Sequence, residues 1–377
     1  MINSIYSNFL GAAPNWYKNT IISFLIANPI ILIVLKSMGL PAGFILGWII
    51  LIQFIFTLAM ALKCYPLQPG GLIAIESVIM GLTDTKQIYY EVDANLKVIL
   101  LLVFMVAGIY FMKDFLLFIF TKLLISIKNK RTLSLLFVFS AAFLSAFLDA
   151  LTVMAVLIAV AVGFYHVYKN VAEKEVGFSE DSADFTIFKG FLRNLLMHGA
   201  VGTALGGVST TVGEPQNLLI ASVADWSFIE FFLKMLPISF PVFISGLITC
   251  YVVERFSLFS FGVQLPSHIR QILYDFDKQE SLERTNSQNM KIITQAIVAL
   301  VLVFSLAFGL AAVGLIGLMI IVLLTAFNGV IEEPKLGKAF EEALPFTALL
   351  VVFFAVVAVI HDQHLFTPVI SYVLSLK

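Results

Sequence analysis

Long apolar runs separated by short polar segments form the main pattern of this chain. A helix needs roughly 20 residues to cross the hydrocarbon core of a bilayer. The pattern therefore predicts membrane-spanning helices from the start of the chain, and an all-α fold. Four runs in the first third reach this length or come close to it: Thr20 to Leu35, Gly43 to Leu62, Leu67 to Leu82 and Leu96 to Met112.

Two stretches that follow are less simple. Asp114 to Ile127 is apolar with a strongly basic end, which is typical of a helix lying in the membrane interface. Thr132 to Tyr168 is apolar but is interrupted at Ser145 to Thr152. One overlong helix, two crossings, or a re-entrant hairpin that enters and leaves by the same face would each fit this second stretch.

Polar segments divide the remainder of the chain. We expect a charged loop over Lys169 to Arg193, a long linker over residues 254–291 and an acidic amphipathic connector over Glu332 to Glu342. The apolar runs between and after these segments are predicted to span the membrane: Glu230 to Val253, Ile292 to Phe308, Leu310 to Phe327 and Phe346 to Ile360.

The distribution of Lys and Arg orients these segments, because cytoplasmic loops of membrane proteins carry an excess of both. We therefore place the basic segments, which include the linker, in the cytoplasm. The N-terminus then also lies in the cytoplasm. A re-entrant hairpin over residues 132–168, or a pair of full crossings, then connects two cytoplasmic loops. The basic segments are 122–131, 169–193 and 255–291, whereas Thr83 to Asn95 is acidic.

The stretch from Gly202 to Asn217, GTALGGVSTTVGEPQN, is unlike a lipid-facing helix because polar residues and glycines interrupt its apolar surroundings. In hydrocarbon each backbone N–H and C=O needs a partner, so an unwound segment survives only inside protein or beside water. Transporters place binding sites at such breaks. We predict an unwound segment at a binding site over Gly202 to Asn217, and a flexible loop outside the membrane is the alternative. The residues expected to break the backbone are Gly206, Gly207, Gly213 and Pro215.

Two carboxylates lie within apolar segments, where a charge is costly unless it is used. Asp149 and Glu214 are therefore the candidate ion-binding and proton-coupled groups, since a cation and a proton can compete for one carboxylate. The alternatives are an aspartate satisfied by a neighbouring helix and a glutamate that only caps the next half-helix. Further oxygen donors, of the kind that hard cations prefer, are Ser145, Thr152, Thr210, Thr211 and Asn217.

Histidines give two weaker predictions. His198 is expected either to relay protons or to bond a carbonyl group. Asp362 with His361 and His364 resembles a set of metal ligands, but we expect an interfacial loop there and no transition-metal site.

The composition, 60% hydrophobic and 12% charged, excludes a soluble globule and agrees with a polytopic membrane protein. The net charge of −1 gives no indication of a nucleic-acid partner. Two cysteines, Cys64 and Cys250, support neither a disulfide framework nor a thiolate metal site. The sequence has no protease, esterase or phosphate-binding motif, so neither an enzyme nor a bound cofactor is expected.

The chain matches itself at an offset of 248 residues, the spacing of Gly81 and Gly329. The loop charges give the two matched halves opposite directions across the membrane, which is the inverted-repeat arrangement of many secondary transporters. The same offset pairs Asp84 with Glu332, Asp93 with Glu341, Leu96 with Leu344 and Asp114 with Asp362.

This repeat predicts how the chain is divided. Residues 1–40 would form an N-terminal cytoplasmic segment and the first membrane helix, 41–253 the first repeat and 292–377 a partial second repeat. Within the first repeat, a closing helix over 230–253 would follow the scaffold helices, the hairpin and the unwound segment. Second copies of Asp149 and Glu214 would fall beyond Lys377, so we expect a C-terminally truncated protein, and an inactive fragment is one alternative.

The segments SAFLDALTV, GTALGGVSTTVGEPQNLLIA and VAVIHDQHLFTP resemble the NhaB family of bacterial Na⁺/H⁺ antiporters. The family lies in a superfamily that also holds arsenite and dicarboxylate permeases. The resemblance implies a bacterial inner-membrane protein that exports Na⁺, with Li⁺ as a second candidate cargo, in exchange for protons and without a nucleotide.

The resemblance also places the family's acidic positions at Asp149 and Glu214. It implies a moving transport domain made of a re-entrant hairpin over Thr132 to Tyr168 and a broken helix over Leu195 to Val223. Family members continue past Lys377. An anion, oxyanion or dicarboxylate permease is the alternative function, and a homodimer is left open.

Overall fold

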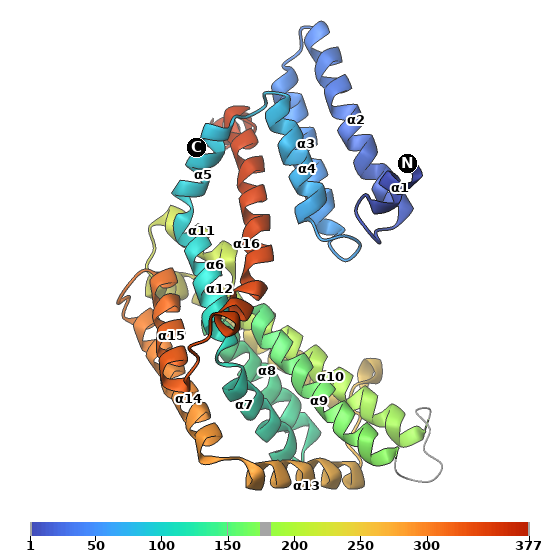
Figure 1. Cartoon of the computed structure of the whole chain (residues 1–377), viewed down its shortest axis with the longest axis vertical. Coiled ribbons are helices and arrows are strands. Elements are labelled where there is room, and N and C mark those ends of the chain that lie inside the picture. Colours follow the sequence, from blue (N-terminus) through green and yellow to red (C-terminus); the bar gives the residue numbers. More distant parts are fainter. Residues whose placement is uncertain (1, 149, 174–181, 376–377) are drawn as a thin grey trace. The chain divides into compact units, whose positions relative to one another are not determined.

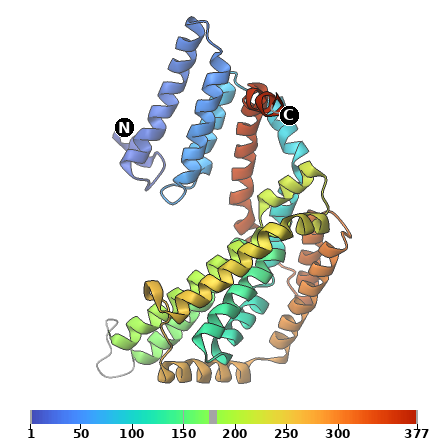
Figure 2. The same ribbon diagram turned by 180° about the vertical axis from the view of Figure 1, so that it is seen from behind.

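The computed structural model describes residues 2–148, 150–173 and 182–375, and the regular structure within them is helical (Figures 1 and 2). The chain forms two compact units. Unit 1 comprises residues 1–99 and 344–377, and unit 2 comprises residues 100–343. Helices α6 (Leu96–Tyr110) and α16 (Glu333–Asp362) each belong partly to both units, because the unit boundaries fall inside them. Pro345 lies within α16, next to the boundary between the two units.

Unit 1 is held together by apolar packing and by polar contacts between its helices. Leu46 and Ile73, both fully buried, join α3 and α4 to Val359 of α16. The side-chain amide of Asn28 in α2 donates to Glu76 Oε2 in α4 at 2.8 Å. Besides its parts of α6 and α16, the unit contains α1 (Ile2–Asn8), α2 (Asn15–Ser37), α3 (Ala42–Ala59), α4 (Leu67–Ile79), α5 (Thr85–Ala94) and α17 (Thr367–Ser375).

Unit 2 is a bundle in which α8 and α10 lie side by side over much of their length (Figure 1). Helices α9 and α12 pack against this pair, α7 packs against α8 and α9, and α14 packs against α7 and α15. With its parts of α6 and α16, the unit contains α7 (Lys113–Ser126), α8 (Lys130–Phe147), α9 (Ala150–Ala172), α10 (Ala183–Gly207), α11 (Pro215–Ala224), α12 (Phe228–Arg255), the 3₁₀ helix η1 (Leu258–Ser260), α13 (Ser267–Glu283), α14 (Asn286–Ala307) and α15 (Val313–Asn328).

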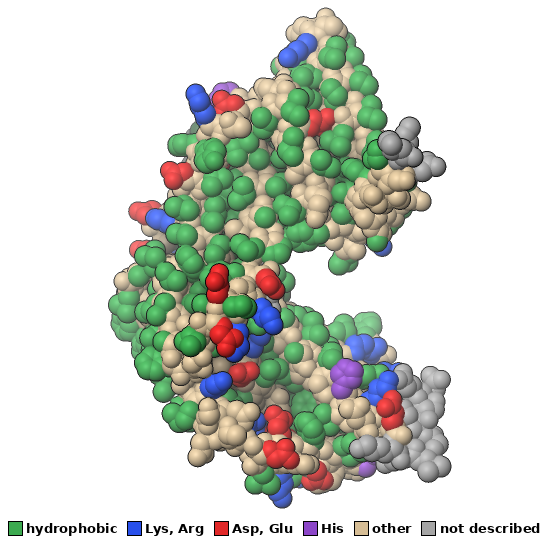
Figure 3. All heavy atoms as spheres, viewed as in Figure 1, with side chains coloured by type: hydrophobic (Ala, Val, Ile, Leu, Met, Phe, Trp, Pro, Cys, Tyr) green, Lys and Arg blue, Asp and Glu red, His purple; other side chains and the backbone are tan. Residues whose placement is uncertain are grey.

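Seven helices of the described chain are long and apolar enough to cross a membrane, by length and composition. An eighth span results if α5 and α6, which meet at 60°, count as one bent segment. Large apolar side chains on the spans are exposed, such as Ile33 at 68% and Phe304 at 59%, and Figure 3 shows apolar side chains over much of the surface it displays. Lipid covers such side chains in a bilayer. The protein is an all-helical, multi-pass membrane protein, as the sequence predicts.

Four segments expected to be loops or connectors are helical in whole or in part. Helix α5 occupies most of Thr83 to Asn95, and α13 forms within the linker over residues 254–291. Helices α9 and α10 extend into Lys169 to Arg193, and α16 begins at Glu333 within the acidic connector.

The expectation of a loop was wrong where these helices lie, because a helix that is polar on one face only resembles a loop in sequence. The connector over Glu332 to Glu342 was expected to be amphipathic, and the start of α16 agrees with this. Helix α13 buries Ile269 and Leu273, which are four residues apart and therefore share a face. Helix α7 covers most of the stretch expected to lie in the membrane interface. Every residue from Leu116 to Ile125 is buried or half-buried against the bundle.

Helices α8 and α10 approach so closely that only glycine fits at two positions of their contact. A Cβ atom at Gly202 would lie 2.5 Å from the carbonyl oxygen of Val138. A Cβ atom at Gly206 would overlap the backbone of Ala142. Small residues four apart allow membrane helices to pack backbone to backbone. The contact places the C-terminal ends of α8 and α10 beside each other.

Gly206→Ala should therefore destabilise the protein, because the added methyl group overlaps backbone that cannot move alone. Overpacking typically costs about 1–3 kcal/mol. We expect a lower unfolding temperature in detergent, followed by tryptophan fluorescence. Gly163→Ala in α9 is the matched control, since its Cβ would meet no atom within 4 Å. Equal unfolding temperatures for the two variants would contradict the close contact of α8 and α10.

Candidate functional site

Between α10 and α11 the chain leaves the helical conformation. Helix α10 ends at Gly207, α11 begins at Pro215, and residues 208–214 form turns. Proline suits the first position of a helix, because its missing N–H would have no partner there. Glycine and proline thus end one helix and begin the next within a short stretch.

Thr210 and Asn217 fasten this turn through their side chains, and both are buried. The Thr210 hydroxyl donates to the carbonyl oxygen of Ala146 in α8. It also accepts hydrogen bonds from the backbone N–H groups of Val212 and Gly213, at 3.3 and 3.2 Å. The Asn217 amide donates to the carbonyl oxygens of Gly207 and Thr210, at 2.9 and 2.8 Å. These side chains satisfy backbone groups that the break leaves without helical partners.

The C-terminal end of α8 lies against the same turn. Ser145 is fully buried, and its hydroxyl donates to the carbonyl oxygen of Thr203 in α10 at 2.8 Å. A Cβ atom at Gly213 would lie 2.6 Å from the carbonyl oxygen of Ser145 and 2.5 Å from that of Gly207. Glycine at position 213 therefore lets the ends of two helices and the turn meet with their carbonyl groups close together.

Thr211 and Glu214 bring further oxygen atoms to the turn. The Thr211 hydroxyl belongs to a residue only 2% exposed and has no hydrogen-bond partner in the described part of the chain. The Glu214 carboxylate lies over the end of α10, since one of its oxygens would be 3.1 Å from a Cβ atom at Gly207. Glu214 stands at the N-cap of α11, but its side chain makes no capping hydrogen bond. A carboxylate beside the negative end of a helix dipole is stabilised by a cation.

The structure thus gathers most of the predicted site residues at one place. Asp149 lies outside the described residues, and Thr152 is buried in the first turn of α9. Hydroxyl, amide, carbonyl and carboxylate oxygens are the donors that hard cations take. The gathered residues are Ser145, Thr210, Thr211, Glu214 and Asn217, with Gly206, Gly207, Gly213 and Pro215 shaping the backbone.

A buried ionic cluster lies elsewhere in the same bundle, where the sequence analysis singled out only His198. Glu254 Oε1 accepts a hydrogen bond from Ser134 at 2.7 Å and lies 3.3 Å from Lys130 Nζ. His198 Nε2 is 2.9 Å from this same oxygen. The other carboxylate oxygen accepts the N–H of Gly262 at 3.0 Å. His198 therefore bonds a carboxylate and joins α10 to α8 and α12.

The charges of Lys130 and Glu254 stand at helix ends where the dipole disfavours them. Lys130 begins α8 and Glu254 is in the last turn of α12, whereas cations favour C-termini and anions favour N-termini. Their side chains are 6% and 0% exposed, so each provides the partner that the other needs. Two charges of opposite sign on the unfavourable ends of apolar runs were the available sequence signal.

The group around Asp362 joins parts of unit 1. Asp362 accepts a hydrogen bond from Thr83 at 2.7 Å, and His361 Nδ1 lies 2.6 Å from Glu91 Oε1. His364, directly beyond α16, has a φ of 52°. These contacts attach the end of α16 to the region of α5, and the described residues contain no set of three side chains placed to hold a metal ion.

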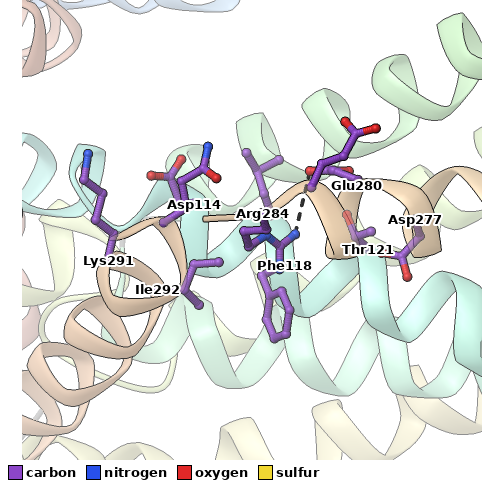
Figure 4. Close-up of a pocket in the computed structure, with 11 residues that line it drawn as sticks. Asp114, Phe118, Thr121, Asp277, Glu280, Arg284, Lys291 and Ile292 are labelled. Atoms are coloured by element: carbon purple, nitrogen blue, oxygen red, sulfur yellow. Dashed lines mark ion pairs between the residues drawn. The ribbon is translucent and has the colours of Figure 1, made fainter. Parts of the chain in front are cut away.

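A polar pocket of about 550 Å³ lies between α7, α13 and α14 (Figure 4). Its acidic side chains have partners: Asp277 lies 2.6 Å from Lys122, and Glu280 lies 3.7 Å from Arg284. The first pair joins α13 to α7, and the second lies within the last turn of α13. The pocket contains none of the predicted ion-site residues. Its lining is Asp114, Leu117, Phe118, Thr121, Asp277, Glu280, Glu283, Arg284, Gln288, Lys291 and Ile292.

A multi-pass fold and oxygen atoms that converge at a turn between two helices are features of secondary transporters. A family model described as bacterial Na⁺/H⁺ antiporter B (NhaB) matches residues 1–377. The chain belongs to the NhaB family of bacterial Na⁺/H⁺ antiporters, as the resemblance implied. It is therefore a member of a transporter family and not an enzyme.

Relatives with similar sequences carry the same family name. The Na⁺/H⁺ antiporter NhaB of Saccharophagus degradans is 62% identical, with 100% of this chain and 77% of that protein covered. The proteins of that name from a Marinomonas species and Vibrio cholerae are 59% and 57% identical. The alignments cover 99% and 100% of this chain, and 76% and 72% of the relatives.

The ionic cluster makes a prediction about stability. Glu254→Ala should lower the free energy of unfolding by about 3–5 kcal/mol, because it leaves the buried Lys130 without its anion. The double variant Lys130→Met/Glu254→Leu should recover most of this loss. Glu280→Ala, which removes a partly exposed pair, should cost less than about 1 kcal/mol. Tryptophan fluorescence during thermal unfolding measures all three, and a double variant no more stable than Glu254→Ala would refute the pairing.

Proposed function

We propose that the chain exchanges Na⁺ for H⁺ at the break between α10 and α11, with the proton gradient as the source of energy. The observation that carries this proposal is the convergence of oxygen atoms from α8, α10, the turn and α11, with the Glu214 carboxylate over the end of α10. Freed carbonyls and half-helix ends are the means by which broken helices hold cations in transporters. The family name of the relatives agrees with this pair of ions.

In this mechanism, Glu214, Thr211 and carbonyl groups at the end of α10 bind the cation. Asp149 follows directly after Leu148, the C-cap of α8, and is the second carboxylate that takes a proton or Na⁺ in turn. A proton that binds to a carboxylate removes the charge that attracts Na⁺, so proton entry releases the cation. Movement of the hairpin (α8 and α9) together with the broken helix (α10 and α11) would expose the site to one side of the membrane at a time.

Helix bounds support the inverted repeat. Shifted by the offset of 248, the bounds of α3 become 290–307 and those of α4 become 315–327, against 286–307 for α14 and 313–328 for α15. Likewise, α5 and α6 shift onto 333–342 and 344–358, within α16. The matched residues Gly81 and Gly329 both have left-handed φ values, 71° and 69°, and lie two residues and one residue after the ends of α4 and α15.

The loop charges support a bacterial inner-membrane location with a cytoplasmic N-terminus. In this orientation the basic segments before α8 and after α12 lie in the cytoplasm. Li⁺, a smaller hard cation, is the second candidate cargo, because the proposed ligands are all oxygen atoms.

The carboxylates can be tested in everted membrane vesicles from cells that express the complete gene. Asp149→Asn and Glu214→Gln should each reduce Na⁺-induced dequenching of a pH-sensitive dye at least about tenfold, because the amide can neither take up the proton nor attract the cation. Asp225→Asn, an exposed position after α11 with a φ of 53°, is the matched control and should retain exchange. If all three variants exchange Na⁺ equally well, the site assignment is wrong and the result favours the anion-permease alternative.

Substitutions at two adjacent threonines should distinguish an effect on Na⁺ binding from an effect on stability. Thr211→Val should raise the Na⁺ concentration needed for half-maximal exchange without lowering the unfolding temperature, because its hydroxyl has no described partner to lose. Thr210→Val should lower the unfolding temperature, because it removes three hydrogen bonds of the turn. Exchange assays and thermal unfolding of both variants measure the difference. Unchanged Na⁺ dependence in Thr211→Val would remove this hydroxyl from the ligand set.

A further inference from the structure

We propose that unit 2 binds the phosphate headgroup of an anionic membrane lipid in a groove between the first half of α10 and the segment after α12. The groove has a volume of about 580 Å³. It contains none of the residues assigned to the exchange site, so the proposal does not rest on that assignment. Its lining is Thr186, Ile187, Lys189, Gly190, Arg193, Ser260 and Val263.

The lining of the groove is suited to a phosphate group. Lys189 and Arg193 are four residues apart on α10, so their side chains share one face of the helix. Hydroxyl groups of Thr186 and Ser260 add neutral donors, and the described lining contains no carboxylate. Hydrogen bonds from lysine, arginine and hydroxyl groups to phosphate oxygens are strong because the acceptor is charged.

The sequence of α10 forces this basic face outward. Phe185, Phe188 and Phe191 are each fully buried on the neighbouring face of the same helical turns, and Lys189 Nζ lies 4.9 Å from the centroid of the Phe185 ring. Gly190 leaves room between the two cations, since a Cβ atom there would touch only Val263 at 3.9 Å. The aromatic face anchors α10 to the bundle while the basic face borders an open groove.

The far wall of the groove lies where a membrane span ends. Helix α12 stops at Arg255, and the segment that follows exposes Phe256 at 65%, Leu258 at 42% and Phe259 at 85%. Aromatic side chains left uncovered at the end of a span belong to the membrane–water interface. A soluble anion would not contact these apolar side chains. A phospholipid can bind the cations through its headgroup and pack its acyl chains against the aromatic rings. Basic pockets at the cytoplasmic ends of membrane helices are typical lipid headgroup sites.

This wall is fixed in place and is joined to the ionic cluster. The Asn194 amide donates to the carbonyl oxygen of Ser260 at 3.0 Å, and the Gly262 N–H donates to Glu254. Figures 1 and 2 show the segment after α12 folded back beside the first half of α10. Gly207 lies about 21 Å further along α10 than Arg193, at 1.5 Å per residue. A lipid held here would therefore stabilise the helix that leads to the break.

The test measures lipid binding to the purified full protein in detergent. Phosphatidylglycerol should raise the unfolding temperature and should remain bound in native mass spectrometry, whereas phosphatidylethanolamine should do neither. The double variant Lys189→Gln/Arg193→Gln should bind phosphatidylglycerol about thirtyfold more weakly, given the usual contribution of two interfacial cations. Without lipid it should unfold at the temperature of the native protein, because both replaced side chains are exposed.

Two controls separate the groove from general charge effects. Lys128→Gln/Lys278→Gln removes two other exposed cations of unit 2 and should leave binding unchanged. Inorganic phosphate or glycerol phosphate, added in place of lipid, should not stabilise the protein. The proposal is overturned if the groove variant binds phosphatidylglycerol like the native protein, if the control pair weakens binding equally, or if free phosphate reproduces the shift. Because binding is the readout, failure of the exchange assignment would not affect this result.

Discussion

The structure depends on one constraint: a buried backbone that leaves the helical conformation must find its hydrogen-bond partners inside the protein. The turn between α10 and α11 meets this requirement with the side chains of Thr210 and Asn217, which bond carbonyl and N–H groups on three elements. Neither side chain is then available as a free polar group. The same bonds that make the break tolerable also fix where its remaining oxygen atoms lie.

Close packing of α8 against α10 is the second requirement for this site. Gly202 and Gly206 bring the two helix backbones into contact, and Gly213 brings the turn against the end of α8. A larger residue at any of these positions would separate the carbonyl groups that now converge. At the other end of the bundle, Glu254 and Lys130 bind α12 to α8 and bury two charges that neither helix would tolerate alone. Close packing thus stabilises one end of the bundle, and the buried charge pair stabilises the other.

Much of this organisation could be predicted from the sequence. The apolar runs indicated the spans, and the glycines and proline around Glu214 indicated the break, because both signals are local. Helix α13 and the early start of α10 were missed because amphipathic helices look like polar loops when their buried face is unknown. Glu254 was missed for a different reason: its partners lie 56 to 124 positions away along the chain, in His198, Ser134 and Lys130. The geometry at Asp149 lies outside the described residues.

The two helices shared between the units have a mechanical consequence. Each has a weak point near the boundary: α6 begins after the 60° bend at Asn95, and α16 contains Pro345, which cannot donate a helical hydrogen bond. Because the bend and the proline both lie close to a unit boundary, a few backbone angles at these two positions can change while the interior of each unit stays unstrained.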